Sequence, residues 1–268
     1  MRALYHILIA VLAALPLSAL TGAQAQAPEV QDIVNRASAA AYYQGRDGKA
    51  KIHMAITDSQ SRERTRDFVI LRRDTDDVDN GEQAFYVLFT RPADVNKTAF
   101  MVWKHTDRDD DRWLYLPALD LVKRIAASDE RTSFVGSHFF YEDVSGRGPA
   151  EDNHELVEDS ETYYTVKSTP KDPDAVEFDH YVSWIHKATF IPIKSEYYDG
   201  TGKVFRTYNA LKVDTVSGYP TVTQSSMEDH RLGGKTVMSY SAVQYDIGLP
   251  EDIFTERYLR APPRKQLR

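Results

Sequence analysis

Short hydrophobic stretches that alternate with a two-residue period recur along most of this chain, and turn residues separate them at short, regular intervals. The stretch Lys51–Thr57 places Ile52, Met54 and Ile56 on one side, which is the pattern of a strand with one buried face. Asn80-Gly81 is a strong signal for a tight turn between strands. Many short strands joined in this way predict a β-barrel or a β-sandwich.

Helical periodicity is found at the two ends of the mature chain, and the aromatic segment at residues 133–143 is also expected to be partly helical. Residues Pro28–Tyr43 place Val30, Ile33 and Ala37 on one apolar stripe, which predicts an amphipathic helix. A last helical turn is expected at Pro250–Leu259. The predicted class is therefore α+β and mainly β. No change in composition marks a boundary, so we expect residues 26–268 to form a single domain.

The stretch 99–144 combines three predicted strands with an aromatic segment. We expect strands at Ala99–Lys104, Arg112–Leu116 and Leu121–Ile125, because each is rich in β-branched and aromatic residues. In the segment 133–143, four aromatic side chains stand among small and polar residues: Phe134, Phe139, Phe140 and Tyr141. An aromatic segment after a run of strands fits a cover over an apolar cavity. Ordinary core packing is the simpler explanation on residue type alone.

The first 25 residues have the features of a secretory signal peptide. Arg2 precedes an apolar stretch at residues 4–20, and Ala23-Gln24-Ala25 fits the small-x-small rule for cleavage. Read as a membrane anchor, the stretch is short and is interrupted by Pro16. We expect cleavage after Ala25 and a soluble protein in the periplasm.

Composition excludes several classes of function. The chain has no cysteine, so it forms no disulfide, has no thiolate nucleophile or thiolate metal site, and carries no lipid-modified N-terminal cysteine. Its formal net charge is −7, and no basic stripe offsets it. A general nucleic-acid-binding function is therefore not expected.

No spacing of polar residues identifies a catalytic centre or a metal site. The sequence has no HExxH, GxSxG or glycine-rich phosphate loop. His180 and His186 lie six residues apart, too far to share one metal ion without a fold-back. The acidic run Asp107–Asp111 has Arg112 where an EF-hand loop needs glycine, so we interpret it as a solvated loop. We expect neither an enzyme nor a bound metal or cofactor.

Residues 113–143 follow a longer pattern, W-x-Y-x-P, then a basic pair with isoleucine, then G-S-x-F-x-Y-E-D. The pattern is carried by Trp113, Tyr115, Pro117, Lys123, Arg124, Ile125, Gly136, Ser137, Phe139, Tyr141, Glu142 and Asp143. It resembles the signature of a LolA-like family of periplasmic proteins, the outer membrane lipoprotein-sorting proteins. Phe89–Trp103 and two later runs are also similar, so the resemblance covers nearly all of the mature chain. Lys123 departs from the pattern, because arginine is expected there.

The resemblance implies an incomplete, strongly curved antiparallel barrel of about 10–11 strands, with an N-terminal helix and short helical segments covering its mouth. Its concave face would bind the acyl chains of a lipid or lipoprotein, with no catalytic group. The partners it implies are that cargo and an inner-membrane exporter of the RND or MMPL type. We expect a monomer that contacts the membrane transiently.

Apolar side chains of the predicted strands and of the aromatic segment are the candidates for binding lipid. For the wall we expect Phe85, Val87, Phe89, Phe100, Val102, Trp113 and Tyr115, and for the cover Phe134, Phe139 and Phe140. A shift of one residue would turn any of these strands to the other face. An adaptor that docks on an exporter without cargo is the alternative, and a lipid hydrolase is disfavoured by the lack of a nucleophile motif. An apolar cavity with bound lipid would distinguish the carrier from the adaptor.

Overall fold

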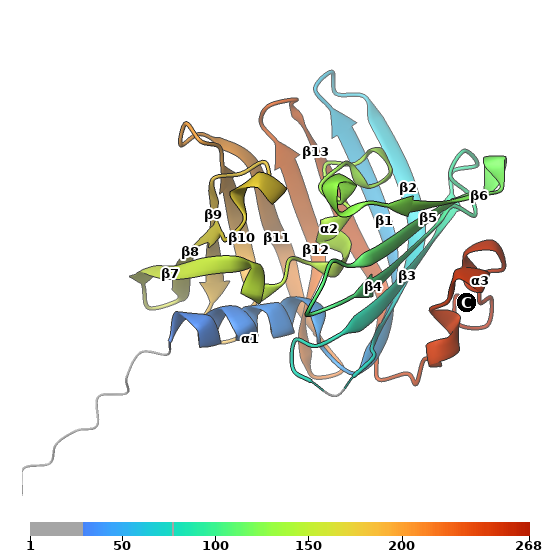
Figure 1. The fold of residues 1–268 in the computed structure, drawn as a ribbon, viewed down its shortest axis with the longest axis horizontal. Coiled ribbons are helices and arrows are strands. Elements are labelled where there is room, and N and C mark those ends of the chain that lie inside the picture. The colour runs from blue at the N-terminus through green and yellow to red at the C-terminus, as the bar shows by residue number, and fades with distance from the viewer. Residues whose placement is uncertain (1–28, 77) are drawn as a thin grey trace, which may run out of the picture.

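The computed structural model describes residues 29–76 and 78–268, which form one long curved antiparallel sheet with short helices (Figure 1). The strands are β1 (Asp47–Asp58), β2 (Glu63–Asp74), β3 (Gln83–Arg91), β4 (Ala99–Lys104), β5 (Asp111–Leu116), β6 (Leu121–Ile125), β7 (Asp152–Asp159), β8 (Tyr163–Pro170), β9 (His180–His186), β10 (Pro192–Tyr198), β11 (Val204–Val216), β12 (Tyr219–Asp229) and β13 (Gly234–Tyr245). The α-helices are α1 (Val30–Tyr42), α2 (Glu142–Ser145) and α3 (Glu256–Arg260). Short 3₁₀ turns span Pro117–Leu119, Ala127–Asp129, Phe134–Gly136, Pro149–Glu151, Pro173–Ala175 and Glu251–Ile253. The predicted signal peptide lies outside the described residues.

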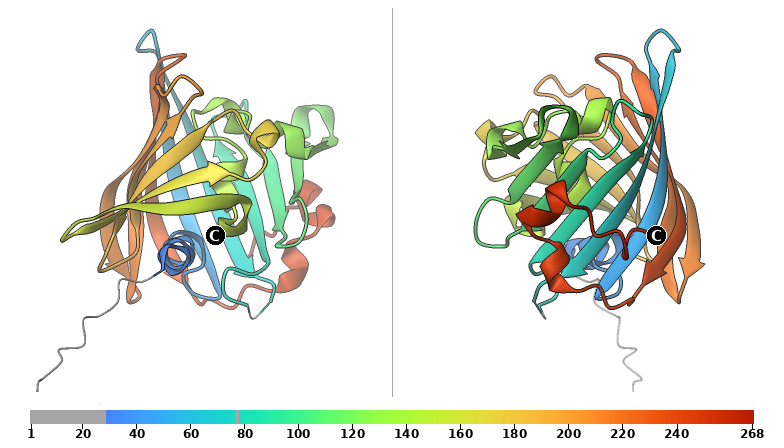
Figure 2. Two further views of the ribbon diagram at one scale, coloured as in Figure 1. Left: turned by 60° about the vertical axis from the view of Figure 1, so that its left-hand side comes forward. Right: turned by 90° about the vertical axis from the view of Figure 1, so that its right-hand side faces the viewer.

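The sheet is an incomplete barrel, as the resemblance implied. Its strand order is β6-β5-β4-β3-β2-β1-β13-β12-β11-β10-β9-β8-β7. Strands consecutive in sequence pair in the sheet, apart from β6 and β7, and the first strand also pairs with the last, with Met54 opposite Met238. The two ends of the order, β6 and β7, do not pair with each other, so the sheet curls without closing (Figure 2).

Thirteen strands form the sheet, rather than the ten or eleven expected. The strands predicted at residues 99–104, 112–116 and 121–125 are confirmed within one residue as β4, β5 and β6, and the predicted N-terminal helix is α1. The sequence pattern misses β7. Four of its eight residues are acidic, which is a poor signal for a strand. The structure tolerates these charges because β7 is an edge strand and most of it is exposed.

Each face of the sheet packs against something different. The concave face carries a large apolar cluster that includes Phe85, Val87 and Phe89 of β3. On the convex face, Leu71 and Tyr86 pack against the C-terminal segment around α3. The expectation that β3 is covered on both sides is therefore confirmed, which explains its unbroken run of apolar residues.

Helix α1 lies across one end of the curved sheet (Figures 1 and 2). Its stripe residues Ile33 and Ala37 are buried against Val166 of β8 and Ile185 of β9. No helix within residues 29–76 and 78–268 is long and apolar enough to span a membrane. Because α1 packs on β8 and β9, it closes the concave side of the sheet at this end.

Candidate functional site

A cavity of about 390 Å³ lies on the concave side of the sheet. Helix α1 bounds it at one end, and the loop-rich segment of residues 126–151, here called the covering segment, bounds it from the side that the sheet leaves open. Helix α2, part of the covering segment, lies inside the curve of the sheet (Figure 1). The residues that line the cavity therefore come from elements far apart in sequence.

One wall of the cavity is apolar. It is formed by inward-facing residues of β1, β2 and β3 together with two aromatic residues of the covering segment: Ala50, Ile52, Phe68, Ile70, Phe85, Val87, Phe134 and Phe139. The strand register explains why these side chains point to the same face of the sheet. Ala50 of β1 pairs with Ile70 of β2, which in turn pairs with Val87 of β3. This wall offers no hydrogen bonds and so suits hydrocarbon.

The rest of the sheet-derived lining, formed by β8 to β13, carries many hydroxyl groups. They belong to Ser168, Tyr181, Ser183, Ser195, Tyr197, Tyr208, Thr221, Tyr240 and Tyr245. The hydroxyls of Ser183 and Ser195 bond to each other at 2.7 Å, and Tyr181 donates to Asp152 Oδ2 at 2.9 Å. Burial, opposed by the nearby Arg206 guanidinium, raises the pKa of Tyr197 to about 12. The phenol is therefore uncharged and a hydrogen-bond donor near neutral pH.

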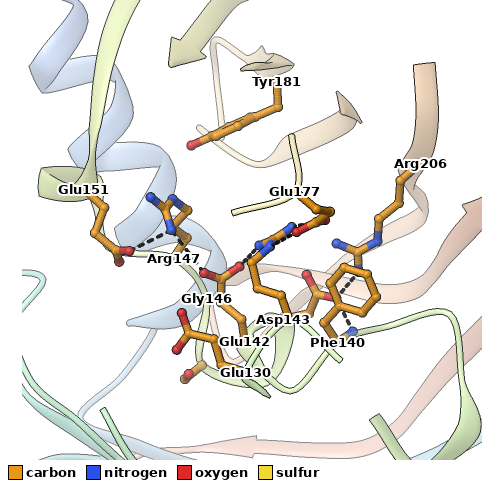
Figure 3. A network of polar contacts seen from close by, with 12 residues as sticks. Glu130, Phe140, Glu142, Asp143, Gly146, Arg147, Glu151, Glu177, Tyr181 and Arg206 are labelled. Atoms are coloured by element: carbon orange, nitrogen blue, oxygen red, sulfur yellow. Dashed lines mark hydrogen bonds and ion pairs between the residues drawn. The ribbon is translucent and has the colours of Figure 1, made fainter. Parts of the chain in front are cut away.

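Buried ion pairs hold α2 against the rest of the chain (Figure 3). Arg131 donates to the two carboxylate oxygens of Glu177 at 2.6 and 2.9 Å and also pairs with Glu142. Arg147 donates from Nε to both oxygens of Asp152 at 3.0 Å and lies 3.3 Å from Glu142. Glu142 is thus buried between two arginines of its own chain.

Two further cations fix the ends of α2. Arg206 of β11 pairs with Asp143, and its guanidinium lies 3.8 Å from the centre of the Phe140 ring. Lys104 of β4 donates to the carbonyl oxygens of Ser145 and Gly146, both at 2.8 Å. Burial lowers the pKa of Lys104, although nearby carboxylates oppose this shift. These contacts tie the covering segment to both halves of the sheet.

Comparison with known proteins identifies the family. A family profile described as "Uncharacterized protein" matches residues 81–261, more than half of the chain. A DUF1329 family protein from Desulfovibrio piger is 29% identical, with a TM-score of 0.78 over 85% of this chain and 97% of that one. A putative outer membrane lipoprotein-sorting protein domain from Vibrio parahaemolyticus is 28% identical, with a TM-score of 0.77 over 86% of this chain and 97% of that one.

A LolA superfamily protein from Nitrosomonas europaea has the same fold, with a TM-score of 0.66 at 21% identity over 85% of this chain and 98% of that one. The chain belongs to a LolA-like family. No curated protein matches it. The LolA-like fold is therefore established along most of the chain.

In this LolA-like chain, four of the ten predicted lipid-binding residues line the cavity: Phe85, Val87, Phe134 and Phe139. Three others, Phe89, Phe100 and Val102, belong to the same apolar cluster, away from the cavity surface. Phe140 is half-buried beneath the Arg206 guanidinium and does not line the cavity.

Trp113 and Tyr115 lie on the opposite face from the one expected. Leu114, between them, pairs with Phe100 and packs against the concave cluster, whereas both aromatic residues pack on the convex face near α3. The predicted strand was right and its orientation was reversed, because every residue of Trp113–Leu116 is apolar or aromatic and the run has no alternation.

Sequence reasoning missed the hydroxyl-bearing wall. A signal was present in β9, where Tyr181, Ser183 and Ile185 alternate with His180 and Val182, and the first three face the cavity. Tyrosine and serine are common on either face of a strand, so residue type alone does not orient them. Within the described part of the chain, no three His, Asp or Glu side chains gather as metal ligands.

The covering segment should respond to pH through Glu130. Arg112 is shared by Glu130 and Asp110, and burial raises the pKa of Glu130 from 4.5 to about 7. The folded protein then binds more protons than the unfolded chain between these two values. We therefore expect the free energy of unfolding to fall as the pH rises from about 4.5 to about 7, and to level off above.

Urea unfolding at pH 5, 6, 7 and 8 measures this effect. Glu130→Gln removes the titrating proton and keeps a hydrogen-bonding side chain, so the variant should lack this part of the pH dependence. Parallel curves for the two proteins would show that Glu130 does not titrate in this range.

Proposed function

We propose that this protein is a periplasmic carrier that encloses the acyl chains of a lipid or lipoprotein in its cavity and performs no catalysis. The single observation that carries the proposal is the cavity of about 390 Å³, with one largely apolar wall, on the concave side of the half-barrel. Pockets that hold small molecules in proteins commonly measure about 300–1,000 Å³. The volume is therefore sufficient for a ligand of that size.

The physical need for such a carrier is simple. Each methylene group exposed to water costs about 0.8 kcal/mol relative to an apolar environment. A long acyl chain therefore does not cross an aqueous compartment unshielded at a useful rate. The similarity to the V. parahaemolyticus lipoprotein-sorting domain supports a cargo of this kind.

The cellular setting rests on the sequence. We propose that residues 1–25 direct export and are removed, that residues 26–268 act as one domain and a monomer, and that the cargo passes to or from an RND or MMPL exporter. The alternative is an adaptor that docks on such an exporter and carries nothing. The cavity favours the carrier, because docking alone requires no internal space.

Uptake of a fluorescent fatty-acid analogue by protein stripped of copurified lipid tests the proposal. Ile70 lines the cavity and is only half-buried, so Ile70→Trp should fill the space with little strain on the core. We expect saturable uptake by the unmodified protein and at least about tenfold weaker uptake by the variant, a change of about 1.4 kcal/mol.

Leu121→Trp is the matched control, because it adds the same side chain on the exposed edge strand β6, outside the cavity. It should leave uptake unchanged. A wild-type protein that takes up no probe, or a probe insensitive to Ile70→Trp, would contradict the carrier and favour the adaptor.

A further inference from the structure

Four tyrosine side chains from separate elements meet at one part of the cavity. They are Tyr42 at the end of α1, Tyr197 of β10, Tyr208 of β11 and Tyr240 of β13, here called the tyrosine cluster. All four line the cavity, as does Asp143 of α2. Burial is the main cause of the strongly raised pKa of Tyr42. The nearby Asp143 carboxylate and the other three phenols raise this pKa further. The cluster therefore joins the helix, the hydroxyl-bearing wall and the covering segment.

Part of this cluster has no partner within the protein. Among the described residues, the hydroxyls of Tyr42 and Tyr197 make no hydrogen bond, whereas the nearby Tyr181 donates to Asp152 and Tyr245 bonds Thr221 at 3.0 Å. A phenol hydroxyl that lines a cavity and has no protein partner can donate to a molecule bound there. Two such groups facing one cavity are accounted for if a ligand or water accepts their hydrogen bonds.

The charges around the cluster disfavour an anionic ligand. Asp143 is beside it, already paired with Arg206 and accepting the backbone N–H of Phe140 at 2.6 Å. Two arginines also line the cavity, but Arg147 is occupied by carboxylates, and Arg72 pairs with a carboxylate at 2.9 Å and donates to backbone carbonyls. The third lining cation, Lys49, donates to the carbonyl oxygen of Arg268 at 2.8 Å, so none of the three lacks a hydrogen-bond partner within the protein.

Burial raises the pKa of Tyr208 and of Tyr240, so these phenols remain protonated near neutral pH. Protonated phenols are hydrogen-bond donors, and their natural partners are carbonyl oxygens. The apolar wall of β1 to β3 adjoins this part of the cavity, since Ile52 of β1 is the cross-strand neighbour of Tyr240. The two walls together fit a molecule that has hydrocarbon at one side and uncharged acceptors at the other.

We propose that the tyrosine cluster binds the uncharged ester or amide carbonyl groups that join acyl chains to their headgroup, so that the cavity prefers acylglycerol-type ligands to free fatty acids. The proposal rests on the carrier function and specifies its ligand class. Tyr42 and Tyr197 donate to the ligand, and the acyl chain lies against Ile52, Ile70 and Val87.

Displacement of the fluorescent fatty-acid analogue at pH 7.5 tests this with two competitors of equal chain length, monopalmitoylglycerol and palmitate. We expect the glyceride to compete at about tenfold lower concentration than palmitate. The double variant Tyr42→Phe/Tyr197→Phe removes two hydroxyls and keeps both rings, so it should weaken the glyceride about tenfold and leave palmitate nearly unchanged.

Tyr164→Phe is the control, because Tyr164 packs beside α1 without lining the cavity and should leave both competitors unaffected. Thermal unfolding verifies that all variants fold. Equal competition by glyceride and palmitate in the wild type, or equal weakening of both in the double variant, overturns the ligand class and leaves the carrier intact. Failure of the wild type to bind any acyl ligand overturns the carrier and this proposal with it.

Discussion

Replacing Arg206 with methionine is expected to lower the free energy of unfolding by about 3–5 kcal/mol. The Arg206 side chain is 1% exposed and is the cation paired with Asp143. It also stacks on Phe140 and donates to the carbonyl oxygen of His138 at 3.3 Å. Methionine fills similar space but leaves the Asp143 carboxylate in a largely buried place without its counter-charge, and this is the main cost.

Urea unfolding of three variants separates the charge from the packing. Arg206→Met/Asp143→Asn removes both charges and should recover most of the loss, because the uncompensated carboxylate is gone. Lys212→Met is the control, since its pair with Asp214 is exposed, with 65% of the lysine side chain accessible, and should cost no more than about 1 kcal/mol. A loss below 1 kcal/mol in Arg206→Met, or no recovery in the double variant, would show that this pair does not hold the covering segment.

Phe134→Ala should also cost about 3–5 kcal/mol. Phe134 is 1% exposed, and its ring centre lies 5.6–6.0 Å from those of Phe68, Phe89, Phe100 and Tyr141. A detachable cover would contribute little to the core, whereas this side chain is at its centre. The simpler explanation from the sequence, ordinary core packing, therefore describes Phe134, which at the same time forms part of the cavity wall.

Thermal and urea unfolding measure this cost, with Leu119→Ala as the control. Leu119 is 70% exposed and its truncation should change stability by about 0.5 kcal/mol or less. If Phe134→Ala instead abolishes probe uptake while stability is nearly unchanged, the covering segment is a separable lid and the core assignment is wrong.

The strands could be predicted from the sequence because alternation and turn residues are local features. The alternation in Lys51–Thr57 indicates a strand with one buried face. The unbroken apolar run of β3 indicates a strand that is buried on both faces. Orientation fails where alternation is lost, as in Trp113–Leu116, and detection fails where an edge strand is mostly charged, as in β7. These are limits of the local signal.

The polar parts of the site depend on contacts that the sequence does not contain locally. Arg206 and Asp143 are 63 residues apart, and Tyr42 meets Tyr240 only because α1 crosses the end of the sheet. Their residue types are equally common on solvated surfaces. Only the curvature of the sheet, which brings β11 and β13 opposite the covering segment, decides that they are interior.

Native mass spectrometry of the protein released from its own periplasm, without detergent, tests the central claim most directly. A lipid carrier should appear with a bound species whose mass is that of an acylated lipid, released on collisional activation, and the Ile70→Trp variant prepared in parallel should have lost most of it. Apoprotein alone in both preparations, from cells in which the protein is active, would contradict the account.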